Sequence, residues 1–480
     1  MNATQSFFKN IGSLFTSQVF GYILTLLFTI YLVRYLGVAN YGILSFALAL
    51  MSMLGIFADF GLNTLMTREI VRNKSLTNKY FNNIFSIKLL QIFILSIFII
   101  LIVKLLKYPN ETAYVLYFMM IFLIFSTFSN FFVSIFQSYE KLEYQSLASG
   151  LNSILMLVGV LILINYGYGL VTFTILYAFV AGIILIYYLY ISSKIFKFSR
   201  PKIDIDWDFW KPTIKTAAQF GLIGVFVTIY IWIDSVMLSF MQGNEAVGLY
   251  NAAYRIVLLL LFIPTVINSA IFPVMSRLHV SDTNSLGIIV EKYFKFMILI
   301  GIPIGIAITI LSNQIIILIF GKAFIDSVPA LQILIWATVF TFGNAAFVQL
   351  FQSTNKQILL TKITFIGMIV NITLNFILIP KFSYIAACFN TLITEFVILS
   401  LVLIMAYRMG YITQRKGLIK DSIKILISSL IMGLFIWEFK DLNLVILIIV
   451  SAFIYLIILF VLRGIDDEDI KIIRNIRNSQ

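Results

Sequence analysis

Fourteen long apolar runs constrain this chain more than any other feature of its sequence. A transmembrane helix needs about 20 consecutive apolar residues, and most of the runs reach that length. They are continuously apolar and do not alternate, so they predict helices and not a membrane β-barrel. The runs are Ile11–Val33, Ile43–Leu65, Ile84–Leu106, Tyr114–Phe136, Leu147–Ile164, Leu170–Ile191, Ile214–Phe240, Val247–Phe272, Phe294–Phe320, Val328–Phe351, Ile358–Ile379, Ile385–Tyr407, Ile423–Trp437 and Leu444–Leu462.

The composition agrees with a polytopic membrane protein. Of the 480 residues, 61% are hydrophobic and only 11% are charged, against about 25% charged in soluble domains. One Cys and one His argue against a disulfide, a His-based metal site and Ser-His-Asp chemistry. No phosphate-binding Gly-rich loop followed by Lys is found, so the sequence gives no sign of an ATP-driven pump. No cofactor and no metal site are expected.

The basic residues predict the orientation of the chain. With a cytoplasmic N-terminus, cytoplasmic segments hold 27 of the 34 Lys and Arg residues and the outer loops hold 6. Both termini are then cytoplasmic, in a prokaryotic cell membrane, and the first run is a retained span. The net charge of +13 is explained by these loops, so no nucleic-acid partner is expected.

Internal repeats predict two lobes. Phe136-Gln137-Ser138 recurs as Phe351-Gln352-Ser353, and the pair Gly37 and Gly42 recurs as Gly243 and Gly248. Six spans separate equivalent points, so the halves share one orientation, as in transporters built from parallel repeats. The expected order is an N-lobe (1–192, spans one to six), a basic cytoplasmic linker (193–213), a C-lobe (214–408, spans seven to twelve), spans thirteen and fourteen (409–462) and a cytoplasmic tail (463–480).

Ionisable residues at membrane depth are costly and mark candidate functional positions. Asp59, Asp234, Arg255 and Glu395 lie inside predicted spans, and Arg34 lies at a span end. We expect Asp59 and Arg255 to line a cavity between the lobes. For Lys88 and Lys322, near span ends, we expect snorkelling to the interface.

Uncharged polar residues also follow helical spacing. Gln18, Tyr22, Thr25 and Thr29 form a polar stripe on the first span, which we interpret as cavity lining. Asn371 and Asn375, spaced four residues apart, are interpreted as a contact between helices.

Several motifs together resemble the polysaccharide (O-antigen type) flippases of the multidrug/oligosaccharidyl-lipid/polysaccharide exporter superfamily, and they extend over nearly the whole chain. The motifs are Tyr31-Leu32-Val33-Arg34-Tyr35-Leu36-Gly37, Asn40-Tyr41-Gly42, Asp59-Phe60-Gly61-Leu62, Asp234 with Val247-Gly248-Leu249-Tyr250 and Ala253, Gly321 through Phe324 before Leu331, and Asn375 with Ile379-Pro380-Lys381 and Ala386-Ala387. One departure is Ala386, where the family often has Gly.

The resemblance implies a fold of fourteen helices in two lobes. It also implies a transporter, and not an enzyme, that flips an oligosaccharide on a polyprenyl (pyro)phosphate from the cytoplasmic to the outer leaflet. Arg34 and Arg255, with Gln18, Tyr22 and Thr25, are then expected to bind the head group. Asp59, Asp234 and Glu395 are expected to couple an ion or orient these residues. Expected partners are this lipid-linked substrate, membrane lipids, a coupling proton or sodium ion, and a glycan polymerase or glycosyltransferase.

Two other functions stay open. An ion-coupled multidrug exporter of the same superfamily would need a buried carboxylate, which Asp59 supplies, but the excess of cations argues against it. A polyprenyl-dependent glycan polymerase or ligase would usually need a large outer loop, and all predicted outer loops are short.

Overall fold

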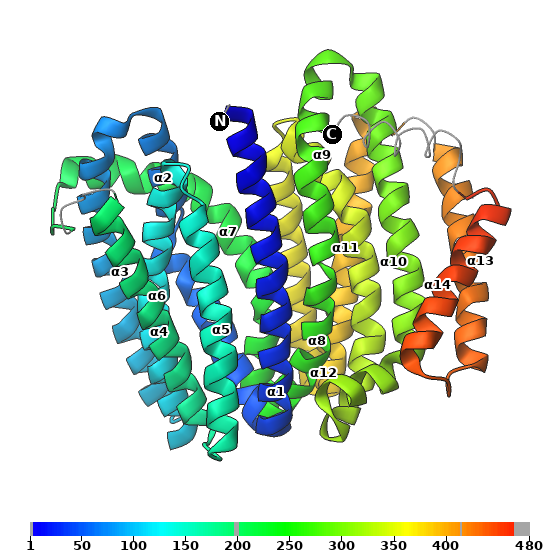
Figure 1. The fold of residues 1–480 in the computed structure, drawn as a ribbon, viewed down its shortest axis with the longest axis horizontal. Helices are drawn as coiled ribbons and strands as arrows, with labels where there is room; N and C mark the ends of the chain where they lie inside the picture. The colour runs from blue at the N-terminus through cyan, green and yellow to red at the C-terminus, as the bar shows by residue number, and fades with distance from the viewer. Residues whose placement is uncertain (1–2, 196–200, 413–414, 465–480) are drawn as a thin grey trace. The chain divides into compact units, whose positions relative to one another are not determined.

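The computed structural model describes residues 3–195, 201–412 and 415–464, and within these ranges the chain forms helices and no strand (Figure 1). This confirms the predicted all-α polytopic fold. The helices are α1 (Ala3–Asp59), α2 (Leu62–Arg72), η1 (Lys74–Leu76), α3 (Thr77–Leu105), α4 (Asn110–Ser138), α5 (Glu143–Asn165), α6 (Leu170–Ile195), α7 (Trp207–Gln242), α8 (Asn244–Leu260), α9 (Phe262–Ser281), α10 (Thr283–Phe320), η2 (Lys322–Ser327), α11 (Val328–Ser353), α12 (Gln357–Arg408), α13 (Arg415–Glu438) and α14 (Leu444–Val461).

The fourteen predicted spans lie on these helices, although the second, Ile43–Leu65, runs past the end of α1 and across Phe60 and Gly61 into α2. Two spans share α1, which bends at Gly37, and two share α12, which bends at Ser383. The eighth span is divided between α8 and α9. Within the described ranges, eleven helices are long and apolar enough to cross a membrane, and the short thirteenth span lies in α13, outside that set. The chain is therefore a multi-pass membrane protein.

The turns of the chain repeat in their backbone conformation. Gly37 has φ 70° and ψ 179°, and its predicted counterpart Gly243 has φ 87° and ψ −176°. A side chain is strained at this φ, which explains why both turns use glycine. A methyl group on Gly42 would meet the carbonyl oxygen of Asn244, and one on Gly248 would meet that of Val38. Each glycine of this repeated pair thus packs on the backbone of the other turn.

The repeated Phe-Gln-Ser motif ends two helices in the same way. The backbone N–H of Lys141 donates to the carbonyl of Phe136, and that of Lys356 donates to Phe351, both at 2.8 Å. The residue before each lysine is left-handed, Glu140 at φ 57° and Asn355 at φ 60°. These are features of a Schellman helix end, so the sequence repeat is also a repeat of local structure.

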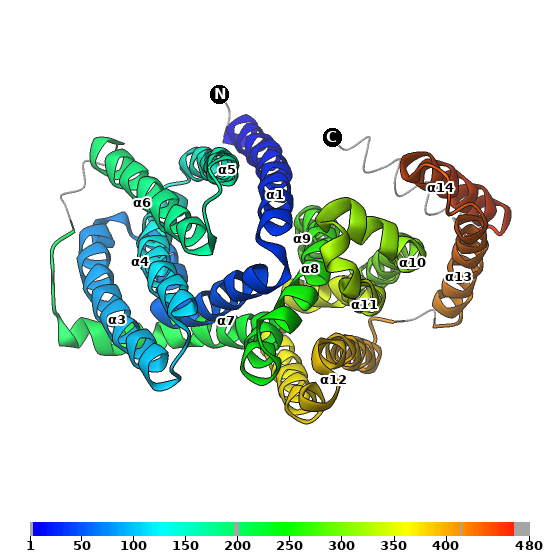
Figure 2. The same ribbon diagram turned by 90° about the horizontal axis from the view of Figure 1, so that it is seen from below.

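The chain divides into two compact units, Met1–Gly248 and Leu249–Gln480. In the first unit, α7 packs on α1, α2 and α3, and α4 packs on α6 (Figure 2). The division falls after α7, whereas the predicted linker, 193–213, precedes it. The assignment of six spans to each lobe stays a prediction.

A buried asparagine fastens the end of the linker to α3. The side chain of Asn83, fully buried, accepts hydrogen bonds from Trp210 Nε1 at 2.9 Å and from the backbone N–H of Asp206 at 3.3 Å. Its amide group donates to Asp204 at 2.8 Å. The start of α7 is therefore fixed to α3 through one polar side chain.

We expect Asn83→Ala to lower the melting temperature of the protein in detergent by several degrees. The substitution removes the acceptor of Trp210 and Asp206, and each buried donor left without a partner costs about 1–3 kcal/mol. The measurement is thermal unfolding followed by tryptophan fluorescence. Asn78→Ala, an exposed position one and a half turns earlier in α3, is the control and should leave the melting temperature unchanged.

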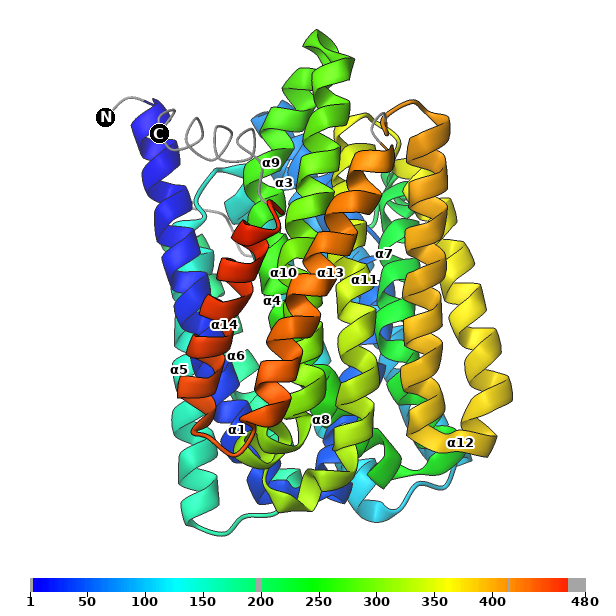
Figure 3. The same ribbon diagram turned by 90° about the vertical axis from the view of Figure 1, so that its right-hand side faces the viewer.

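The second unit is held by two apolar cores. One gathers buried residues of α9 to α12, including Phe342, Phe347 and Phe351. The other joins α10 to α13 and α14, which lie side by side in Figure 3. The ion pair of Lys295 with Asp421, at 2.8 Å, adds a polar tie between α10 and α13. The last two helices are thus integral to the second unit.

Candidate functional site

A break between α1 and α2 places the Asp59 carboxylate beside a cavity of the first unit. Phe60 and Gly61 are both left-handed, at φ 42° and 83°, so α1 ends and α2 starts in a new direction. The Asp59 carboxylate accepts hydrogen bonds from the backbone N–H of Gly61 at 3.3 Å and of Asn63 at 3.1 Å. Acidic side chains are favourable at the start of a helix, so Asp59 stabilises the break that positions it.

A lysine of α3 pairs with this carboxylate. Lys88 Nζ lies 2.8 Å from Asp59 Oδ1 and 3.4 Å from the carbonyl oxygen of Ala58. The Lys88 side chain is 0% exposed, whereas that of Asp59 is 26% exposed. The expectation that Lys88 snorkels to the interface is therefore wrong, because its ammonium group is fully covered and finds two acceptors, Asp59 and the carbonyl of Ala58, inside the unit.

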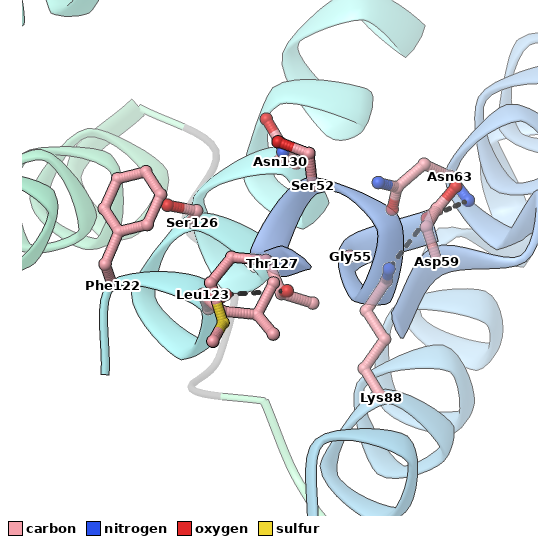
Figure 4. A pocket seen from close by; sticks show the side chains of 11 residues that line it. Ser52, Gly55, Asp59, Asn63, Lys88, Phe122, Leu123, Ser126, Thr127 and Asn130 are labelled. Atoms are coloured by element: carbon pink, nitrogen blue, oxygen red, sulfur yellow. Dashed lines mark hydrogen bonds and ion pairs between the residues drawn. The ribbon is translucent and has the colours of Figure 1, made fainter. Parts of the chain in front are cut away.

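The pair borders a cavity of about 270 Å³ within the first unit (Figure 4). Two helices, α1 and α4, supply most of its wall, and α2 and α3 each supply one residue. The lining residues are Met51, Ser52, Gly55, Asp59, Asn63, Lys88, Phe122, Leu123, Ser126, Thr127 and Asn130. A polar cavity inside an apolar helical unit is the feature expected of a binding site.

Several polar groups of the cavity have hydrogen-bonding capacity left. Ser52 and Thr127 donate to carbonyls of their own helices, at 2.7 and 2.8 Å. Within the described ranges, no hydrogen bond is recorded for the Ser126 hydroxyl or the Asn130 amide. Asn63 Nδ2 likewise has no recorded partner, although Asn63 Oδ1 accepts from Ser134 at 3.4 Å. A bound polar molecule would find donors on both sides of the cavity.

Helix α7 packs directly behind the break. A methyl group on Gly221 would lie 2.6 Å from both the carbonyl carbon and oxygen of Phe60. One on Gly61 would meet the carbonyl oxygen of Ala217 and lie 2.6 Å from the N of Gly221. The two backbones touch because both residues are glycines, and the position of Asp59 depends on this contact.

The other predicted site residues of the first unit lie apart from this cavity. Arg34 is exposed, next to the Gly37 bend, and Asp234 is 2% exposed on α7. Thr25 Oγ1 lies 3.5 Å from Ser153 Oγ, at the packing of α1 on α5. The side chains of Gln18 and Tyr22 lie outside the described residues. Substrate binding by these residues stays a prediction.

In the second unit, Glu395, Asn371 and Asn375 belong to polar contacts of α11 and α12. Glu395 Oε2 accepts from Asn344 Nδ2 at 2.8 Å, which joins α12 to α11. Asn375 donates to Asn371 at 3.0 Å, and Asn390 donates to Asn375 at 2.9 Å, across the two arms of α12. Arg255 on α8 is half-buried. The role of Glu395 and Arg255 in coupling or substrate binding also stays a prediction.

Sequence reasoning missed Lys88, Asn63, Ser126 and Asn130. A signal for Lys88 was present in the sequence. Lys88 is the fifth residue of the third predicted span, which begins on the cytoplasmic side, and Asp59 is the seventh residue from the cytoplasmic end of the second span. Adjacent antiparallel spans place such residues at similar depth. Asn63, Ser126 and Asn130 carry no comparable signal, since serine and asparagine are common at helix contacts.

Comparison with known proteins agrees with this architecture. The sequence model of the family described as "Polysaccharide biosynthesis protein" matches residues 7–279, and that of MatE matches residues 221–377. The chain is 25% identical to the putative O-antigen transporter of Escherichia coli K12, over 82% of this chain and 95% of that protein. It is 29% identical to the probable flippase AglR of Haloferax volcanii, over 34% of this chain and 35% of AglR. The chain matches less than half the length of the first relatives found, all archaeal.

The fold is shared with a solved structure. Lipid II flippase MurJ, in an inward closed conformation, matches with a TM-score of 0.77 at 17% identity, covering 93% of this chain and 97% of MurJ. This likeness shows the fold of a polytopic helical membrane protein. Since the model of the family described as "Polysaccharide biosynthesis protein" matches more than half of the 480 residues, the chain belongs to that family.

Proposed function

We propose that the protein is a flippase for oligosaccharides linked to a polyprenyl (pyro)phosphate, and that it catalyses no bond-making chemistry of its own. The family match over residues 7–279 is the observation that carries this proposal. The name of AglR supports a flippase, and the name of the O-antigen transporter supports a glycan cargo. The membrane of a prokaryotic cell, with cytoplasmic termini, is the proposed location.

The structure supports this function through its polar interior. Each polar group left without a partner in hydrocarbon costs several kcal/mol, so a sugar head group needs a polar path. The cavity beside Asp59 offers hydroxyl, amide and carboxylate groups inside a helical unit. The lipid tail can stay in the bilayer while the head group moves. Arg34 and Arg255 are the proposed contacts of the head-group phosphate, because a guanidinium matches phosphate geometry.

For Asp59 we propose an orienting role, since its carboxylate is already engaged by Lys88 and two backbone N–H groups. A proton or sodium ion would then couple elsewhere, with Asp234 or Glu395. A drug exporter of the same superfamily is the second candidate, and the MatE match over residues 221–377 favours it. A glycan polymerase or glycosyltransferase is the proposed neighbour that delivers or consumes the cargo.

Transport is tested with the purified protein in proteoliposomes that carry a fluorescent lipid-linked oligosaccharide. We expect the protein to make inner-leaflet substrate accessible to a reducing quencher outside. Arg34→Ala and Arg255→Ala should each lower that rate at least tenfold, since a charge-assisted contact is worth about 1.5–3 kcal/mol. Arg277→Ala, on an exposed turn of α9, is the matched control. Export of cationic dyes without movement of the glycolipid would instead support the drug exporter.

A further inference from the structure

The charges around the first-unit cavity are balanced before any ligand enters. Among the described residues that line it, one is acidic, Asp59, and one is basic, Lys88, and the two pair at 2.8 Å. The Asp59 side chain lines the cavity and is 26% exposed, whereas the Lys88 side chain is completely covered. An entering molecule therefore meets carboxylate oxygen but no accessible cation.

This arrangement selects against charged ligands. A phosphate or uronate would face the partly exposed carboxylate and could not reach Lys88 Nζ without movement of α3. A cation would compete for Asp59 with an ammonium group that is already in place and cannot diffuse away. Within the described ranges, no group of three or more His, Cys, Asp and Glu side chains is close enough to hold a metal ion.

The remaining groups suit an uncharged, hydroxyl-rich ring. Asn63 and Asp59 lie on one side of the cavity, and Ser126 and Asn130 project from α4 on the other (Figure 4). Amides, hydroxyls and a carboxylate together can donate to and accept from sugar hydroxyls. Phe122, Leu123 and Met51 add apolar surface, against which the C–H face of a sugar ring can pack.

The size of the cavity limits what it can hold. Its volume, about 270 Å³, is below the range of about 300–1,000 Å³ that is typical for drug-sized ligands. This volume suits a single sugar ring better than a whole oligosaccharide.

We propose that this cavity is a subsite for one uncharged pyranose ring of the glycan cargo, held by Asn63, Ser126, Asn130 and the lysine-neutralised carboxylate of Asp59. The inference rests on the proposed function. It adds where a sugar ring of the cargo binds and that this ring is uncharged. Lys88 acts as a built-in counter-ion that keeps Asp59 usable as a hydrogen-bond acceptor without creating a cation site.

The test is saturation-transfer NMR on the full-length protein in detergent. The probes are the methyl glycosides of glucose, galactose, mannose and N-acetylglucosamine, the anion methyl glucuronide, and the cation methyl glucosaminide. We expect at least one uncharged glycoside to bind and both charged probes to bind at least tenfold more weakly. The double variant Ser126→Ala/Asn130→Ala should weaken the uncharged probe about tenfold. The control is Asn78→Ala/Ser193→Ala, which changes the same chemistry at exposed positions.

Preferential binding of the glucuronide or the glucosaminide would overturn the proposal, and so would equal loss of binding in the double variant and the control. The comparison of probes on the unmodified protein does not depend on the folding of any variant. The proteoliposome assay separates the two proposals. Flipping without binding of any uncharged glycoside removes the subsite only, whereas glycoside binding without flipping removes the flippase function only.

Discussion

Asp59→Asn should destabilise the protein more than Lys88→Met does, although the two residues form one ion pair. The asparagine variant leaves a completely covered ammonium group without a counter-charge, facing only neutral acceptors: the amide oxygen of the new side chain and the carbonyl of Ala58 at 3.4 Å. An uncompensated buried charge costs about 3–5 kcal/mol. The methionine variant leaves a carboxylate that is partly exposed and keeps two backbone N–H donors, so its loss is expected to be about 1.5–3 kcal/mol.

The combined variant Asp59→Asn/Lys88→Met should recover part of the stability lost by Asp59→Asn alone, because it removes the orphaned charge. Thermal unfolding in detergent, followed by fluorescence-detected gel filtration, measures all three. The exposed pair of Lys141 with Glu143, at 3.7 Å, supplies the control: Lys141→Met should change stability by less than about 1 kcal/mol. Strictly additive losses would show that Lys88 and Asp59 do not interact in the protein.

Gly221→Ala is expected to have an effect of similar size through packing alone. The added methyl group would lie 2.6 Å from the carbonyl group of Phe60, and backbone atoms cannot rotate out of its way. Overpacking usually costs about 1–3 kcal/mol, and the rigid neighbour favours the upper end. The break that positions Asp59 must shift, so sugar binding or transport should fall together with the melting temperature.

Gly150→Ala is the matched control for this substitution. Gly150 lies inside α5 with ordinary backbone angles, and nothing lies within 4 Å of the added methyl group. Alanine there should raise stability by about 0.5–1 kcal/mol, because glycine is a poor helix residue. A Gly221→Ala protein as stable as the unmodified one would mean that α7 does not touch the break.

The sequence carried much of the fold and less of the site. Apolar length alone located the fourteen spans, because hydrocarbon allows few alternatives to a helix. The repeated turn at Gly37 and Gly243 was also visible, since a left-handed backbone requires glycine there. A pairing such as Lys88 with Asp59 depends on how two helices face each other, which apolar runs do not encode. The hydrogen bonds of Asn83 with the linker could not be predicted for the same reason.

The Asp59 side chain takes part in three features of the structure at once. Asp59 caps α2, neutralises Lys88 and forms part of the cavity wall. Thermodynamic linkage is reciprocal, so a molecule that docks against this carboxylate stiffens the start of α2 to the same extent that a stiffer start of α2 favours docking. We expect a longer side chain at this position, even glutamate, to be unable to cap α2, pair with Lys88 and line the cavity together. Binding of a molecule in the cavity would then no longer affect the start of α2.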